Sequence, residues 1–184
     1  MALPITVLII FLCCSLVNAE SKDRPKLDST DPMYYWEKGN HGQKISREEF
    51  NILMNQIEQK LIDLKVASSK ISIAGANFSY ENGKIWEIEL DSMRENIQLA
   101  IKYLTEVKNK PDSMTFSLVL YIVMRDIVST AYDFDKIKPF EDTLNKAHTY
   151  LSIWSTAFQK AHLVPLAVSK DNKIALNRGE KPKD

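Results

Sequence analysis

Hydrophobic residues recur every three or four positions along four segments of this chain, and this spacing constrains the fold more than any other feature. The stripes run over residues 50–64, 86–104, 116–134 and 140–161, and the last segment starts near Pro139. Side chains with this spacing fall on one face of an α-helix. Each segment therefore predicts an amphipathic helix, and with flanking residues the helices are expected to be about twenty-five residues long, or about seven turns at 3.6 residues a turn.

Helix-terminal signals divide these segments. Ser46 followed by Glu49 is a capping box at the start of the first helix, Pro111 ends the second, and Pro165 is expected to end the fourth. Short links make consecutive helices antiparallel. The sequence predicts an all-α fold, an up-down-up-down four-helix bundle over residues 45–165 with irregular polar ends.

The first 19 residues predict a cleaved signal peptide. They contain no Lys or Arg, carry an apolar run over residues 5–12, and end in Val-Asn-Ala. The run is shorter than the roughly 20 residues of a membrane span, although a retained anchor is the alternative. Both cysteines, Cys13 and Cys14, lie inside this segment. We expect a secreted or periplasmic protein whose mature chain lacks cysteine.

The two ends of the mature chain are predicted to lie outside the bundle. Residues 20–44 are a polar leader with two prolines and two glycines, interrupted by the aromatic island of residues 33–36. Four large side chains in a row are rarely left in solvent, so the island should pack back onto the bundle. Residues 166–184 are predicted to be a polar tail.

The link between the first two helices, residues 68–83, is unusually long and apolar. Gly75 and the pair Asn82-Gly83 are turn signals, so the segment is expected to wrap the bundle or to form a short hairpin. It also contains Asn77 in an Asn-Phe-Ser glycosylation sequon, which matters only if the protein passes through a eukaryotic secretory route.

The balance of charge excludes partners that are chosen by bulk electrostatics. Lys and Arg number 24, Asp and Glu also number 24, and the formal net charge is zero. A nucleic-acid-binding domain is usually basic, and binding to an anionic membrane surface also relies on basic residues. We therefore expect neither nucleic acid nor, once the signal is cleaved, a membrane as partner.

The outer face of the third helix is the predicted partner-binding surface. Arg125 points almost directly away from the core stripe, so the helix is not a membrane span. Around it lie further large side chains: Leu118, Tyr121, Ile122 and Tyr132. Tyrosine and arginine among aliphatic residues are typical of interaction hot spots.

Two kinds of cover are possible for this face. The internal candidates are the aromatic island and residues 71–80, both of which need a place to bury aromatic side chains. The external candidate is another protein or a second copy of the chain. In that case Tyr35 and Trp36 of the leader are expected to contribute to the same partner-binding surface.

The histidines offer little metal or cofactor chemistry. His41, His148 and His162 lack the spacing of a zinc HExxH site or of the Glu-x-x-His units of di-iron bundles. Met54 on the first helix and His162 on the fourth resemble the axial ligands of exported b-type four-helix cytochromes, which would imply haem. Otherwise no metal and no cofactor is predicted.

No catalytic motif is present. The chain lacks a nucleophile elbow and a phosphate-binding loop, and the carboxylates Glu87 and Asp91, which could hold a hard cation, are better explained as part of a solvated helix face. The sequence therefore favours a non-catalytic binding or interaction module. The alternatives are a small-molecule or haem carrier that uses the space between the first and fourth helices, and an enzyme without a recognisable motif.

Overall fold

The computed structural model describes residues 27–178, and within this range the chain is helical with no strand. The prediction of an all-α fold is confirmed. The elements in chain order are α2 (Pro32–Asn40), α3 (Arg47–Ser69), the 3₁₀ turn η1 (Ile73–Gly75), α4 (Tyr80–Asn109), α5 (Met114–Asp135), α6 (Asn145–Phe158), the π-helical turn η2 (Gln159–Leu163) and α7 (Val164–Asn177). The predicted signal peptide lies outside the described residues.

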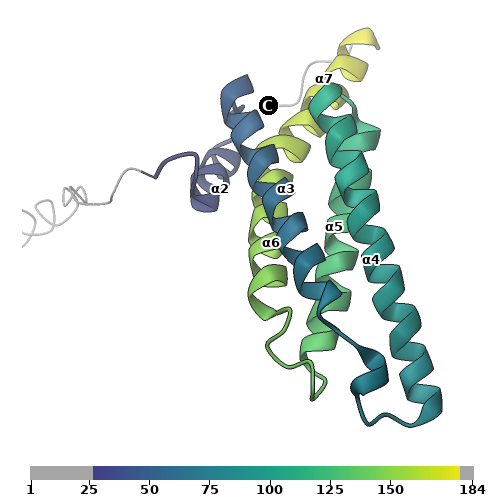
Figure 1. The fold of residues 1–184 in the computed structure, drawn as a ribbon. Helices are drawn as coiled ribbons and strands as arrows, with labels where there is room; N and C mark the ends of the chain where they lie inside the picture. The colour runs from purple at the N-terminus through teal and green to yellow at the C-terminus, as the bar shows by residue number, and fades with distance from the viewer. Residues whose placement is uncertain (1–26, 179–184) are drawn as a thin grey trace, which may run out of the picture.

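The four helices α3, α4, α5 and α6 lie side by side and alternate in direction (Figure 1). Each contacts the next along the chain, and α6 closes the ring by contacting α3. This arrangement encloses a single hydrophobic core. The turn between α4 and α5 lies at one end of the helices, and the link from α3 through η1 to α4 lies at the opposite end. Helix α7 extends beyond the end where α5 begins.

Helix α3 begins where the sequence places it. The backbone N–H of Glu49 donates to Ser46 Oγ at 3.2 Å, and the backbone N–H of Ser46 donates to Glu49 Oε2 at 2.7 Å, so the capping box is complete. Both contacts satisfy backbone donors at the helix start. The predicted stripe of this helix is wholly buried: Phe50, Leu53, Met54, Ile57, Leu61 and Leu64.

The other three stripes also form the core. Buried members shared by prediction and structure include Ile97, Ile127 and Leu151, each with no exposed surface. Trp86 is only half-buried, but its ring packs against Phe134 with centroids 5.2 Å apart. Arg125 is exposed, as the helical periodicity of α5 predicts.

The described part of the leader, predicted to be irregular, contains a helix, which corrects one prediction. Its residues from Pro32 form α2, with Asp31 as N-cap: the Asp31 side chain accepts a hydrogen bond from Met33 N at 2.8 Å. Proline is favoured in the first helical turn because its missing N–H has no partner there anyway. The helix contacts α6 and η2, so the expected packing of the aromatic island is confirmed.

Pro165 does not end the last helix, which corrects a second prediction. The chain passes from α6 through η2 into α7, so the described part of the predicted tail is helical as far as Asn177. A helical proline lacks an N–H and crowds the carbonyl four residues earlier. The π turn ends directly before it, where Val164 N–H bonds to the Gln159 carbonyl five residues back. This widened turn lets the helix continue.

Two further boundaries differ from prediction. The pair Asn82-Gly83 is not a turn but lies in the first turn of α4, and no hairpin forms because η1 precedes this helix. The last long helix starts at Asn145 rather than near Pro139, since residues 136–144 form turns that still bury Phe140 and Leu144.

Candidate functional site

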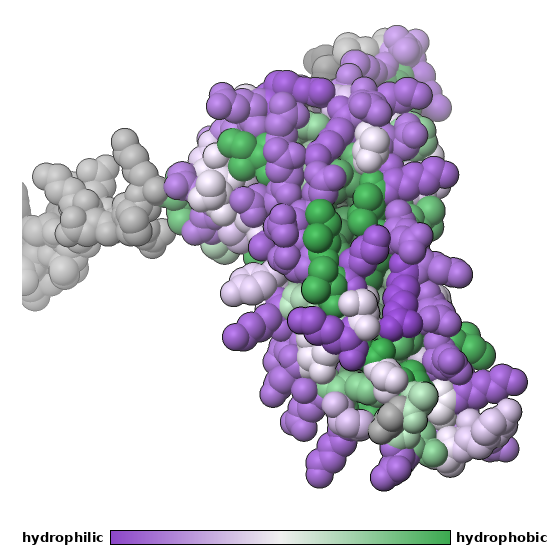
Figure 2. All heavy atoms as spheres, in the orientation of Figure 1, coloured by the Kyte–Doolittle hydropathy of each residue, from purple (hydrophilic) through white to green (hydrophobic). Residues whose placement is uncertain are grey.

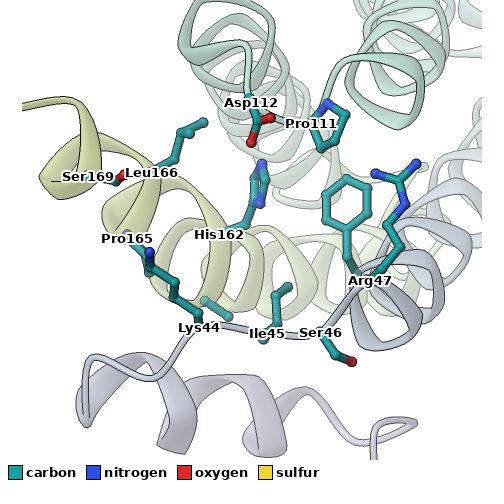
Figure 3. Close-up of a pocket in the computed structure, with 12 residues that line it drawn as sticks. Lys44, Ile45, Ser46, Arg47, Pro111, Asp112, His162, Pro165, Leu166 and Ser169 are labelled. Carbon is teal, nitrogen blue, oxygen red and sulfur yellow. The ribbon is translucent and has the colours of Figure 1, made fainter. Parts of the chain in front are cut away.

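A pocket of about 380 Å³ opens at the end of the helices where α3 and α5 begin (Figure 3). Its lining comes from residues 44–47 before and at the start of α3, the α4–α5 turn with Pro111 and Asp112, the turn η2, and the first turns of α7. We call it the His162 pocket. Its volume falls in the range of about 300–1,000 Å³ that is typical of small-molecule sites.

His162 is held in the pocket wall by two aromatic rings and one hydrogen-bond contact. Its imidazole is packed by the rings of Phe50 and Phe158, with centroids 4.9 and 5.2 Å away. Its Nε2 lies 3.3 Å from Ser117 Oγ. Burial lowers the pKa of His162 to about 4, against a smaller opposing effect of the Pro111 backbone and the Asp112 carboxylate. The side chain is therefore neutral near pH 7.

The pairing of His162 with Ser117 does not make a nucleophile that substrate can reach. Ser117 has no exposed surface and does not line the pocket. Asp112 is the one carboxylate in the lining. A serine nucleophile needs a hydroxyl oxygen that substrate can reach, which Ser117 does not offer. Acid–base catalysis by a pair of carboxylates needs two carboxylates in the pocket, and the lining has one.

The two residues considered for haem ligation are not brought together in the pocket. Met54 has no exposed surface and is absent from the lining that contains His162. The rings of Phe50 and Phe158 already pack against the imidazole. Met54 is thus a core side chain of α3, and His162 is a wall of the pocket.

Two cations border the pocket. Lys44 lies before the helix α3 and Arg47 in its first turn, and both are exposed. The Arg47 guanidinium is held in place: Nη2 donates to the Lys108 carbonyl oxygen at 3.3 Å, and Cζ lies 5.4 Å from the centroid of Phe50. Across residues 27–178, neither cation forms an ion pair with a carboxylate.

Next to the pocket, Glu49 joins α2 to α3. Its carboxylate accepts hydrogen bonds from Lys38 and Tyr34, and its backbone carbonyl accepts one from Tyr35 at 2.9 Å. Burial would raise the pKa of Glu49, but the donors from Lys38, Tyr34 and the Ser46 backbone outweigh it and lower the pKa to about 2. The same contact raises the pKa of Lys38.

The other side of α2 lies against the π turn. A Cβ at Gly39 would lie 2.7 Å from the backbone carbonyl carbon of Lys160, so only glycine allows this approach. The Lys160 ammonium then lies over the Trp36 ring at 3.6 Å and donates to Asn40 Oδ1 at 2.6 Å. These contacts hold η2 and His162 in position.

The second candidate surface is the outer side of α5. We call it the α5 face and define it by Leu118, Ile122, Arg125, Asp126 and Tyr132. All five are exposed, and the three hydrophobic members expose 43%, 48% and 53% of their surface. Within residues 27–178, neither Arg125 nor Asp126 forms an ion pair. Tyr121, also predicted for this surface, is half-buried at its edge.

Neither proposed internal cover reaches the α5 face. The aromatic island packs on the other side, where the Tyr35 ring lies 6.0 Å from that of Trp154 on α6. Residues 71–80 pack at the end of the helices, where Phe78 contacts Phe140. Tyr35 is fully buried and Trp36 lies beneath Lys160, so the structure does not bring either residue to the α5 face.

Hydrophobic side chains reach the surface elsewhere too, including Val66 on α3 and Ile85 and Ile88 on α4. Figure 2 shows hydrophobic residues along the middle of one side of the molecule, surrounded by hydrophilic ones. Single exposed hydrophobic side chains are normal in soluble proteins, whereas the stripe in Figure 2 is a hydrophobic patch on one side of the molecule. The α5 face differs because its hydrophobic members flank two adjacent opposite charges.

By length and composition alone, α5 is the one helix within residues 27–178 that could cross a membrane. Core helices of soluble proteins pass the same test. Here the inner side of α5 is packed in the core, and Arg125 and Asp126 lie near its middle.

The remaining sequence candidates belong to neither surface. His148 is buried, hydrogen-bonds to Asp135 at 2.8 Å and packs edge-on beneath the Tyr132 ring of the α5 face, with centroids 5.9 Å apart. Asp91 forms an ion pair with Arg94 at 3.1 Å. Asn77 is exposed in the turn before α4. Within the described residues, no group of three His, Cys, Asp or Glu side chains is arranged to hold a metal ion.

Comparison with models of known protein families, with curated proteins and with solved structures finds no match for this chain. The function therefore has to be argued from the two surfaces alone. Of these, the α5 face was predicted from the sequence. The His162 pocket was not, because its walls come from segments far apart in the chain.

Proposed function

We propose that this chain is an exported, non-catalytic binding protein that associates with a second copy of itself through the α5 face. In this proposal residues 1–19 are a cleaved signal, and α3 to α6 form an up-down-up-down four-helix bundle that acts as a rigid support. The observation that carries the proposal is the adjacent, exposed Arg125 and Asp126 beside the exposed side chains of Leu118 and Ile122, with Tyr132, whose ring lies under the Lys136 ammonium, at the edge.

Self-association is favoured because the α5 face is complementary to itself. A two-fold axis places the same surface of both copies in contact. If two α5 helices meet antiparallel near their middle, Arg125 of one copy approaches Asp126 of the other, and the reverse contact forms as well. Leu118, Ile122 and Tyr132 would then be removed from water on both sides, which supplies the main driving force.

A charge exchange tests this pairing. Arg125→Asp or Asp126→Arg alone would oppose like charges across the axis, and each should raise the dimer dissociation constant by at least about tenfold. The double variant with both changes exchanges the charges and should recover most of the affinity. Sedimentation equilibrium on residues 20–184, which contain every described element, measures all four proteins. Equal masses for the wild type and both single variants would refute the pairing.

Export is tested separately. The full chain expressed in a secreting host should appear outside the cytoplasm with Glu20 as its first residue. A product that starts at Met1 and stays in the membrane fraction would instead identify residues 1–19 as a retained anchor.

A further inference from the structure

We propose that the His162 pocket is a binding site for a small organic anion with an apolar body, of the kind represented by a medium-chain carboxylate. The site is independent of the α5 face. It is built from three separate stretches of the chain, and one of them contains a π-helical turn, an element that occurs frequently at functional sites.

The inner walls of the pocket suit an apolar body. Ile45 and Phe50 around the start of α3 and Leu166 of α7 contribute hydrophobic surface, and Pro111 adds a wall without a backbone donor. Water in such a site makes few hydrogen bonds, so an apolar group gains by replacing it. The His162 ring completes this wall without adding a charge near pH 7, because burial lowers its pKa to about 4.

The anionic end is selected at the rim. Of the charged side chains in the lining, Lys44 and Arg47 are cationic and Asp112 alone is anionic, which leaves an excess of one positive charge while His162 is neutral. Figure 3 shows Asp112 on the far side of the His162 ring from Lys44. Figure 3 also shows Arg47 on the opposite side of the pocket from Lys44, so a carboxylate can approach either cation, and at Lys44 it stays away from the Asp112 carboxylate.

Arg47 is oriented in advance for this task. Its contacts with the Lys108 carbonyl and the Phe50 ring fix the guanidinium but use only one of its five N–H donors. The remaining donors can bind a carboxylate in pairs, and a side chain that is already held loses less freedom on binding.

Three probes of equal chain length separate charge from hydrophobicity: octanoate, octan-1-ol and octylammonium. Each is titrated into residues 20–184 labelled with ¹⁵N, and the shifts of the backbone amides are followed. We expect octanoate to shift the amides of Ile45, His162 and Leu166 and to bind at least about tenfold more tightly than either other probe. Absence of these shifts, or equal affinity for octylammonium, would overturn the proposal.

Variants connect the affinity to the named residues. The double variant Lys44→Gln with Arg47→Gln should weaken octanoate binding at least about tenfold, whereas Lys65→Gln, an exposed cation on α3 outside the pocket, should leave it unchanged. Ser169→Phe keeps both cations but fills the pocket, and it should abolish binding. Equal weakening by Lys65→Gln, or full affinity in Ser169→Phe with an unchanged melting temperature, would place the binding elsewhere.

Discussion

Gly39 of α2 lies directly against the backbone of Lys160 in the π turn, so close that a Cβ at position 39 would meet the Lys160 carbonyl carbon, its oxygen and its Cβ at 2.7 Å. The helix that precedes α3 and the turn that carries His162 are thus assembled as one unit. The polar contacts of Glu49 secure the other side of α2. This unit, rather than the four long helices alone, positions the His162 pocket.

The first prediction concerns this close approach. Gly39→Ala should lower the free energy of unfolding by about 1–3 kcal/mol, because α2 has to move away from the Lys160 backbone. Urea denaturation measures the loss, and hydrogen exchange should accelerate at α2 amides before those of α3. The matched control is Gly83→Ala in α4, whose added Cβ meets its nearest neighbour, Phe78, at an ordinary 3.6 Å. That change should stabilise by about 0.5–1 kcal/mol. A neutral Gly39→Ala would contradict the account.

The second prediction concerns Glu49. Glu49→Gln removes the charge that binds Lys38 and should lower the free energy of unfolding by about 1–3 kcal/mol. Its neighbour Glu48 is exposed, and Glu48→Gln should change stability by no more than about 0.5 kcal/mol. Because the folded pKa of Glu49, about 2, lies below its usual 4.5, its contribution is present above pH 4.5 and is lost as the pH falls toward 2. Urea titrations of both variants at pH 7 and pH 3 measure this, and equal loss in both variants would refute the role of Glu49.

The third prediction concerns His162. Its folded pKa of about 4 lies below the usual 6.5, so the unfolded chain binds the proton more tightly. Stability is therefore full above pH 6.5 and falls as the pH drops toward 4, by about 2–3 kcal/mol. His162→Phe keeps a flat ring in the wall and should remove this part of the pH dependence. Denaturation between pH 7 and pH 4 gives the slopes, and parallel profiles for wild type and variant would contradict the assignment.

The fourth prediction tests the core. Ile97 has no exposed surface, whereas Leu99 on the same helix is 37% exposed. Ile97→Asp buries an unpaired carboxylate at a cost of several kcal/mol, comparable with the whole stability of a domain of this size, and should unfold the protein. Leu99→Asp should remain folded. Circular dichroism distinguishes the two, and a cooperative, wild-type-like melt of Ile97→Asp would refute the core assignment.

Local signals predicted the long helices well and the tertiary contacts poorly. The Ser46–Glu49 capping box and the apolar stripes are short-range features, so they could be read directly from the chain. The sequence also contained a start signal for α2, namely Asp31 followed by Pro32. This short helix is stabilised, however, by Tyr35, whose side chain is buried against α3 and α6. Periodicity alone did not reveal that dependence on distant residues.

The continuation through Pro165 and the pocket could not be predicted for a related reason. A proline usually ends a helix, and the π turn that precedes Pro165 packs against α2 at Gly39, a contact between residues far apart in the chain. The pocket needs residues 44–47, the turn at Pro111 and the start of α7 to meet in space. The α5 face could be predicted because all its residues lie on one helix. That no internal segment covers it could be seen only in the structure, which shows where the aromatic island and residues 71–80 pack.

The most direct test of the central proposal is the mass of residues 20–184 in solution, measured by light scattering over a range of concentrations. The account predicts a dimer for the wild type, a folded monomer for Ile122→Glu on the α5 face, and a dimer for Ile88→Glu on the exposed side of α4. A wild type that stays monomeric at every concentration, or a dimer that only Ile88→Glu disrupts, would contradict it.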